Sequence, residues 1–268
     1  MTAPRPLVAP LFVPATRPER FAKAAVSGAD AIIIDLEDAV PAAQKDAARA
    51  NLAGMPDFSV EAFVRVNAIG TAWFEADLDA LASIGCQTIC LPKAETPDLI
   101  DQIVTRLGPD VDILAQIETA RGLRDCGPII CHPNVLQLAF GPADFYLDMR
   151  MSASARMTNH ALCALAVASR AAGKASPLDG PAFAINDQDV LARECGSAAA
   201  AGCGGKLCIH PSQIEVVKRS FLPKQSELDW AHWIIAADQG GAAQMVDGQM
   251  IDAPIVERAR WLLDRAGA

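Results

Sequence analysis

The sequence predicts an α/β fold, a (β/α)8 TIM barrel with extra helices at its C-terminal end. Eight short apolar runs recur along the 268-residue chain, and segments with helical character lie between them. The runs are rich in Val, Ile, Leu and Phe and show little polar alternation, which is typical of strands buried on both faces of a parallel sheet. An open doubly wound sheet is the alternative, but it usually carries a glycine-rich fingerprint after its first strand, and "FVPATRP" has none. Eight strand–helix units therefore favour the barrel.

The predicted strands, in order, are residues 9–15, 31–37, 62–67, 88–93, 112–118, 136–141, 181–185 and 205–210. After the first run, Thr16 is followed three residues later by Glu19, which predicts a capping box, and Gly28 predicts the helix end. The stretches 73–85 and 158–173 have apolar residues at helical spacing and also stop at a glycine.

The expected organisation is a catalytic barrel domain over residues 1–220 and a helical extension over residues 221–268. We expect the extension to pack on a neighbouring subunit. No low-complexity linker and no block of like charges separates the two parts in the sequence.

Composition predicts a cytoplasmic protein that binds neither nucleic acid nor membranes. The net charge of -9 gives no basic footprint, and no apolar segment reaches membrane length or resembles a signal peptide. The eight cysteines include no C-x-x-C pair, so we expect reduced, mostly buried thiols. A zinc site made of Cys203, Cys208 and His210 is disfavoured because its spacing does not match the common structural sites.

Charged or polar residues follow nearly every predicted strand, where catalysis occurs in barrels of this kind. Each alone has a structural alternative; Lys93, for example, could be a solvated side chain. Together they predict a polar mouth with several carboxylates and at least two cations. The residues are Arg17, Asp35, Glu37, Asp38, Arg65, Asn67, Lys93, Glu118, Asp144 and His210.

Glu118 and Asp144 follow neighbouring strands, which lie about 4.8 Å apart, so their side chains can converge. Two close carboxylates repel each other unless a cation lies between them. Oxygen ligands with room for water and substrate suit Mg²⁺, with Mn²⁺ as an alternative. Such a metal would polarise a substrate carbonyl, and Arg65 offers a bidentate fork for a substrate carboxylate.

The run "AIIIDLED" (residues 31–38) places three carboxylates at the end of the second strand. Alternation puts Asp35 and Glu37 on one face and Asp38 on the other, so the three are not expected to share one task. Glu37 and Asp38 are expected to hold metal-bound waters or to orient Arg65, and Asp35 to be structural.

Several motifs, in order along nearly the whole chain, resemble those of the citrate lyase β-subunit-like proteins of the HpcH/HpaI aldolase superfamily. They are "LFVPATRPERFAKA", "DLEDAVPAAQKDAAR", "VRVNAIGTAWFEADL", "LPKAE", "QIETARGL", "FGPADF", "GKLCIHPSQI" and "DGQMIDAPIVERA". The resemblance implies a magnesium-dependent barrel that cleaves or forms a C–C bond beside a coenzyme A thioester.

The resemblance also implies roles for individual residues. Glu118 and Asp144 are similar to metal ligands, and Arg65 to the anchor of a 2-oxo acid carboxylate. Asp252 is similar to a catalytic aspartate supplied by a neighbouring subunit, which implies a homo-oligomer, a trimer or a hexamer. Arg17 and Lys23 resemble positions near the coenzyme A phosphates.

Three functional hypotheses remain open at this point. The first is a lyase that converts a malyl-, citramalyl- or citryl-CoA type of 3-hydroxyacyl-CoA into acetyl-CoA and a 2-oxo acid. The second is a malyl-CoA-type thioesterase with the same pocket. The third is a subunit that acts only in a complex with partner chains.

Overall fold

The computed structural model describes residues 6–238, 243–246 and 248–266. The chain divides into two compact units, Met1–Lys218 and Arg219–Ala268. The first unit contains the large parallel sheet, and the second contains a helical pair with a small hairpin.

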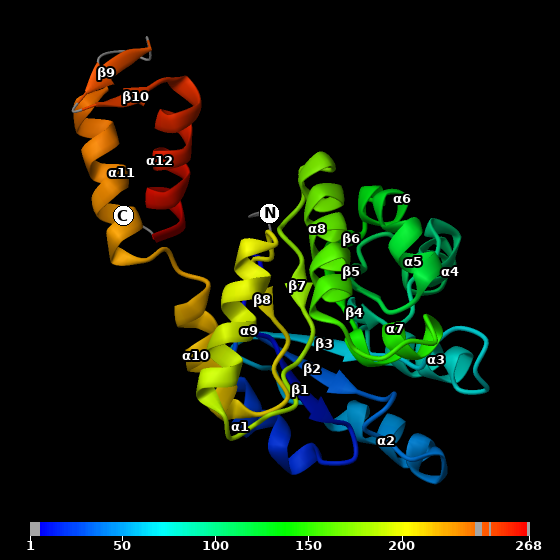
Figure 1. Cartoon of the computed structure of the whole chain (residues 1–268). Helices are drawn as coiled ribbons and strands as arrows, with labels where there is room; N and C mark the ends of the chain where they lie inside the picture. The colour runs from blue at the N-terminus through cyan, green and yellow to red at the C-terminus, as the bar shows by residue number, and fades with distance from the viewer. Residues whose placement is uncertain (1–5, 239–242, 247, 267–268) are drawn as a thin grey trace. The chain divides into compact units, whose positions relative to one another are not determined.

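The first unit is an eight-stranded parallel sheet in the order β1 to β8, with helices on its outside (Figure 1). Main-chain bonds connect the eighth strand segment back to the first, because the Phe12 amide donates to the Cys208 carbonyl at 2.8 Å. This is the predicted TIM-barrel-like fold. Its strands are Leu11–Pro14 (β1), Ala31–Asp35 (β2), Glu61–Arg65 (β3), Thr88–Leu91 (β4), Asp112–Ile117 (β5), Val135–Phe140 (β6), Leu178–Asp179 (β7) and Gly205–Lys206 (β8).

Helices follow the strands in alternation, because neighbouring parallel strands are joined by crossover connections that usually contain a helix. Short helices follow β1, β2 and β5, whereas a long helix, α8, follows β6. The α-helices of this unit are α1 Phe21–Ala25, α2 Lys45–Ala50, α3 Phe74–Ser83, α4 Pro97–Leu107, α5 Ala120–Arg124, α6 Cys126–Cys131, α7 Pro142–Asp148, α8 Ala155–Ala171 and α9 Gln188–Ala200. Helix α10, Ile214–Ser220, begins in this unit and ends in the second. The 3₁₀ helices are η1 Pro18–Arg20, η2 Ala42–Gln44, η3 Asn51–Gly54 and η4 Pro211–Gln213.

The barrel interior is apolar along most of its length and becomes polar at one end. Ile33, Phe63 and Leu114 belong to one buried cluster. Side chains two residues apart on a strand share a face, so the residues that follow on the same face are Asp35 and Arg65. The same inward face of these strands is therefore apolar in the barrel interior and polar at the carboxyl-terminal mouth.

Two local predictions are wrong. The seventh strand is Leu178–Asp179 rather than residues 181–185, which form a loop. Pro181 has no amide hydrogen for a sheet bond, and Phe183 is 66% exposed. The Thr16 capping box is absent, because the chain enters α1 through a 3₁₀ turn and Glu19 accepts a bond from Arg17 Nε at 2.5 Å.

The second unit has a core of its own. Helices α11 (Gln225–Ala237) and α12 (Ala253–Ala266) flank an antiparallel hairpin, β9 (Gln244–Val246) with β10 (Gln249–Ile251). Among the described residues of the whole chain, no helix is both long and apolar enough to span a membrane. The buried residues of this core are Ala231, Ile234, Ile251, Val256, Ala259 and Leu262.

Candidate active site

A cavity of about 370 Å³ opens at the carboxyl ends of the strands. Its walls include five of the charged residues that the sequence singled out, namely Asp35, Asp38, Arg65, Glu118 and Asp144. A larger cavity of about 590 Å³ lies beside α8 and α9, and none of the predicted site residues lines it. The smaller cavity, called the cleft below, is therefore the candidate active site.

The guanidinium of Arg65 is buried and surrounded by three carboxylates. It donates two bonds to Asp35, Nε to Oδ1 at 2.7 Å and Nη2 to Oδ2 at 2.6 Å. Its Nη1 lies 3.2 Å from Glu37 Oε2 and 3.7 Å from Asp38 Oδ2. Charge-assisted, bidentate contacts of this kind fix the guanidinium plane strongly.

The prediction that Asp38 faces away from Asp35 and Glu37 is wrong, because all three carboxylates lie next to the Arg65 guanidinium. Strand β2 ends at Asp35, and the chain bends over the next residues, so strand alternation does not extend to Glu37 and Asp38. Asp35 also holds the bend, because its carboxylate accepts the amides of Glu37 at 2.8 Å and Ala39 at 3.1 Å. Asp35 orients Arg65 more directly than the two residues that were expected to do so.

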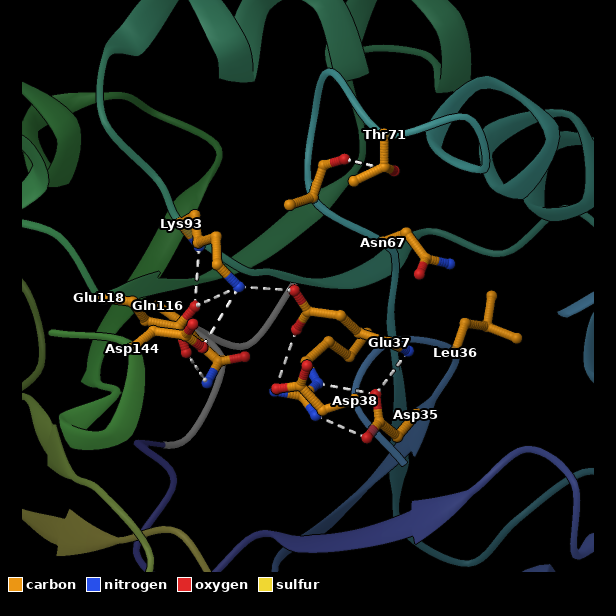
Figure 2. Close-up of polar contacts among 12 residues, drawn as sticks. Asp35, Leu36, Glu37, Asp38, Asn67, Thr71, Lys93, Gln116, Glu118 and Asp144 are labelled. Carbon is orange, nitrogen blue, oxygen red and sulfur yellow. Dashed lines mark hydrogen bonds and ion pairs between the residues drawn. The ribbon is translucent and has the colours of Figure 1, made fainter. Parts of the chain in front are cut away.

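Lys93 lies at the centre of the remaining carboxylates rather than in solvent (Figure 2). Its Nζ is 2.9 Å from Glu37 Oε1, 3.2 Å from Asp144 Oδ2 and 4.0 Å from Glu118 Oε2. Burial opposes the charge, but the three carboxylates outweigh it and raise the pKa of this ammonium. The residue has a φ of +49°, an uncommon left-handed conformation for a non-glycine residue, two positions after β4.

Glu118 is held rigidly just beyond β5. Its Oε2 accepts the Lys93 amide at 3.0 Å, and its Oε1 accepts the side-chain amide of Gln116 at 3.1 Å. Gly141 lies directly against it, and a Cβ at that position would be 2.2 Å from Glu118 Oε1. A glycine is therefore required after β6 for Glu118 to keep this position.

Burial raises the pKa of Glu118 to about 7, with further contributions from the charges of Glu37 and Asp144. Burial also raises the pKa of Glu37. One oxygen of Glu37, Oε2, is buried and accepts no hydrogen bond from the described residues, although Arg65 Nη1 lies 3.2 Å from it. These carboxylates have more negative charge than the neighbouring cations neutralise, which is the electrostatic setting that a bound cation would relieve.

The residues present fit a hard divalent cation. Glu118 and Asp144 approach the same ammonium from the end of β5 and from the first turn of α7, so one cation can face both carboxylates. Among the described residues, no group of three or more His, Cys, Asp or Glu could hold a metal ion. A cation bound by these two carboxylates would thus need water or substrate oxygens to complete its coordination, as is usual for Mg²⁺.

A buried lysine that sequence reasoning missed supports the loop after β2. Lys45 Nζ donates to the carbonyls of Leu36 and Glu37 at 2.6 and 2.7 Å and to Asn67 Oδ1 at 2.5 Å. The fully buried Asp77 in turn accepts both the main-chain and side-chain amides of Asn67. Lys45 follows Glu37 by eight residues in the sequence. Its role becomes apparent only when its position at the start of α2 is known.

Glu37 and Lys93 are not part of the cleft lining, but they contact Arg65 and Asp144, which are. The predicted site residues Arg17, Lys23 and Asp252 also lie outside the lining. Arg17 and Lys23 are exposed on and beside the short helices after β1, where Arg17 contacts Glu19. Asp252 belongs to the second unit, where its carboxylate accepts the Ile255 amide at 3.1 Å and caps α12. His210 caps η4, because its side chain accepts the Ser212 amide at 3.2 Å.

Comparison with known proteins identifies relatives along the whole chain. The model of the HpcH/HpaI aldolase/citrate lyase family matches residues 9–211. A citrate lyase subunit beta-like protein of Mycobacterium tuberculosis is 38% identical over 265 residues, covering 96% of this chain and 94% of the relative. A (3S)-malyl-CoA thioesterase of Cereibacter sphaeroides is 34% identical over 272 residues, again covering 96% and 94%.

Among solved structures, that of protein CitE from Mycobacterium tuberculosis in complex with magnesium, acetoacetate and coenzyme A is similar throughout. Its TM-score is 0.87 at 38% identity, and the match covers 98% of this chain and 99% of that one. A structure of the same protein with magnesium and pyruvate gives a TM-score of 0.77 at 35% identity, covering 96% and 98%.

Replacing Lys45 with methionine should lower the free energy of unfolding by about 3 kcal/mol, because two carbonyls and one amide oxygen lose their buried donor. The matched control is Lys23→Met, which removes an exposed lysine and should change stability by less than about 0.5 kcal/mol. Urea unfolding measures both. Equal stabilities for the two variants would contradict the role assigned to Lys45.

The raised pKa of Glu118 makes the stability of the metal-free protein depend on pH. A folded-state pKa of about 7, against an ordinary value of 4.5, favours folding when the group is protonated, and this contribution disappears as the pH rises from 4.5 to 7. The free energy of unfolding of Glu118→Gln, compared with that of the wild type, should therefore increase by up to about 3 kcal/mol as the pH rises across that interval. Denaturation in EDTA at several pH values measures the difference, and a difference independent of pH would refute the shift.

Proposed function

The chain belongs to the HpcH/HpaI aldolase/citrate lyase family, and from this we propose that it is a magnesium-dependent carbon–carbon lyase. Its substrate would be a 3-hydroxyacyl-CoA of the malyl-, citramalyl- or citryl-CoA type, cleaved to acetyl-CoA and a 2-oxo acid. The observation that carries the proposal is the pair of carboxylates, Glu118 and Asp144, converging on one cation at the barrel mouth beside a fixed arginine.

Glu118 and Asp144 would hold Mg²⁺, or Mn²⁺ in its place, and the related CitE structures with magnesium support this assignment. The ion would polarise a substrate carbonyl or hydroxyl oxygen and stabilise the negative charge that develops on it. Gly141, Gln116 and the Lys93 amide keep Glu118 in place for this purpose. Lys93 and Glu37 border the same position and would orient the carboxylates or water molecules around it.

Arg65 would bind the substrate carboxylate. Asp35 accepts one hydrogen bond from Arg65 Nε and one from Arg65 Nη2, and these two bonds fix the guanidinium in the cleft wall. A rigid cation loses little side-chain entropy when it binds an anion. Glu37 and Asp38 contact the same guanidinium and would act through its orientation.

Bond cleavage requires a proton acceptor for the substrate hydroxyl and a proton donor for the departing enolate of acetyl-CoA. The hydroxyl oxygen gives its proton to the acceptor and becomes the carbonyl oxygen of the 2-oxo acid as the C–C bond breaks. The electron pair of that bond forms the enolate, which then takes up a proton from the donor. Asp252 from a neighbouring copy is our candidate for that proton transfer. In this proposal the second unit packs on a neighbouring subunit, and the protein is a homotrimer or a hexamer.

Coenzyme A would enter over β1. Phe12 and Pro14 of this strand line the cleft, Arg17 directly precedes η1, and Lys23 lies on α1. Both side chains are exposed and cationic, which suits contacts with the coenzyme A phosphates. A cytoplasmic location, where coenzyme A thioesters are available, belongs to the same proposal.

A thioesterase is the alternative that a specific observation favours, because a (3S)-malyl-CoA thioesterase is 34% identical over 272 residues. The same cleft would hold the thioester while water attacks its carbonyl. A subunit dependent on partner chains is the third possibility, supported by the 31% identity over 280 residues with the citrate lyase subunit beta of Leuconostoc mesenteroides.

Incubation of the purified protein with Mg²⁺ and malyl-, citramalyl- or citryl-CoA, followed by mass spectrometry, separates these possibilities. The lyase yields acetyl-CoA and an oxo acid, whereas a thioesterase yields free coenzyme A and the hydroxy acid. Glu118→Gln should reduce turnover at least about 100-fold, and the control Glu215→Gln, an exposed residue of α10, should not. Wild-type turnover in Glu118→Gln would refute the site, and turnover only with added partner chains would establish the third possibility.

A further inference from the structure

We propose that the larger cavity, of about 590 Å³ beside α8 and α9, binds an amphiphilic monocarboxylate with an alkyl chain of medium length. This is the chemistry of a free fatty acid. The alkyl chain would occupy the space between the two helices, and the carboxylate would pair with Arg193. The site, called the helix cavity below, goes beyond the proposed function and does not depend on it.

The helix cavity lies on the outer side of the sheet, whereas the cleft lies at the mouth of the barrel interior. Leu178 and Leu207 belong to the buried cluster of that interior. Because side chains alternate along a strand, their neighbours Asp179 and Lys206 point the other way, and both line the helix cavity. The cavity is therefore bounded by β7 and β8 on one side and by α8 and α9 on the other.

The two helices present one face each to the helix cavity. The lining residues run from Ala155 to Leu162 on α8 and from Val190 to Ala198 on α9, at positions i, i+3, i+4 and i+7 of each helix. Small side chains such as Ala155, Ser197 and Ala198 add little volume to these faces, so the space between the helices stays open. The faces extend over about 10–12 Å at about 1.5 Å per residue, which suits an alkyl chain of medium length.

Arg193 is the charged group of the helix cavity that is available to a ligand. The buried Lys206 ammonium lies 2.5 Å from an Asp179 carboxylate oxygen and 3.2 Å from one of Glu194, so these three groups are engaged with one another. Arg193 is exposed, lines the same cavity and forms no ion pair within the part of the chain that the structure describes. The two cations balance the two carboxylates, and the charge left without a partner is positive. An anion is therefore the complementary ligand.

The remaining wall of the helix cavity suits an alkyl chain. Pro142, Leu162 and Val190 contribute apolar surface to it. Phe183, which also lines it, is 66% exposed. A large apolar side chain exposed beside an open cavity is typical of a binding surface. Each methylene group buried there adds to affinity, whereas a small anion without a chain would leave this wall in contact with water.

The cleft does not compete for this ligand when no metal is bound. The cleft carboxylates outnumber the cations that they contact, and Arg65 already faces three of them. An excess of negative charge repels a carboxylate. A fatty acid that binds the metal-free protein is therefore expected in the helix cavity.

Calorimetric titration of the full chain in EDTA with octanoate, octanamide and butyrate tests the inference. Octanamide has the same chain length without the charge, and butyrate has the charge with a shorter chain. Octanoate should saturate one site and bind at least about threefold more tightly than octanamide and tenfold more tightly than butyrate. Smaller ratios would overturn the inference. So would the absence of saturable binding, which is the result expected if a second copy of the chain covers the cavity.

A charge variant tests the role of Arg193. Arg193→Gln should weaken octanoate binding at least about threefold and leave octanamide binding unchanged, because only the carboxylate loses its partner. The matched control is Arg170→Gln, which removes an exposed arginine of α8 outside the cavity lining. Unchanged octanoate affinity in Arg193→Gln, or an equal loss in Arg170→Gln, would overturn the inference.

A filling variant locates the alkyl chain. Ser197→Phe adds a bulky side chain to the face of α9 that lines the cavity and should weaken octanoate and octanamide binding at least about tenfold. The control Ala192→Phe adds the same side chain at an exposed position of α9 outside the lining. Circular dichroism establishes that both variants fold. Unchanged affinities in Ser197→Phe, or equal losses in the two variants, would overturn the assignment to this cavity.

The inference and the proposed function can fail separately. The helix cavity and the cleft share Pro142, Ala143, Pro181 and Phe183 in their linings, but octanoate binding is measured without Mg²⁺ or a thioester. If no acyl-CoA is cleaved or hydrolysed while octanoate binds as described, the proposed function fails and the inference stands. If an acyl-CoA is cleaved and octanoate does not bind, the function stands and the inference fails.

Discussion

The ion pair between Arg65 and Asp35 is the interaction on which the rest of the cleft depends. The two residues are direct partners in the register of β2 and β3, and each is the last residue of its strand. The strands are held in register by their main-chain ladder and by buried pairs such as Ile33 and Phe63. The apolar core thus sets the position of a charged pair that would be costly to bury with any poorer geometry.

From this pair the polar network extends in two directions. The bend after Asp35 carries Glu37 against both Arg65 and Lys93, and Lys45 holds the main chain of that bend from behind. Across the mouth, Lys93 links Glu37 to the carboxylates that follow β5 and β6. Electrostatic preorganisation of this kind costs folding free energy and is useful only where charge develops during a reaction. The excess of carboxylates over cations is therefore the feature that most directly indicates function.

Much of the fold could be predicted from the sequence, because buried parallel strands are continuous apolar runs and the helices between them end at glycines. The exception, β7, has two residues, Leu178 and Asp179, and is too short to give a pattern, whereas the apolar "PAFAI" that follows is a loop. Apolar composition alone does not distinguish a strand from a loop that starts with proline.

The site could be predicted in outline, because strand ends in a barrel must meet at one mouth. The contacts between the individual site residues could not be predicted, because strand register and loop bends are set by the whole fold. Asp35 was expected to be structural, yet it lies opposite Arg65 in the register and holds it with two hydrogen bonds. Lys93 reaches the carboxylates through a left-handed main-chain conformation, and no sequence pattern reports that conformation for a lysine.

The central claim is that Glu118 and Asp144 form a cation site next to an arginine that binds the substrate carboxylate. A crystal structure with Mn²⁺ and pyruvate, with anomalous data to locate the metal, tests it most directly. The account predicts one anomalous peak about 2.0–2.6 Å from oxygens of both carboxylates, with the pyruvate carboxylate bound next to it, within reach of Arg65. A metal peak bound away from Glu118 and Asp144, or pyruvate bound outside this cleft, would contradict it.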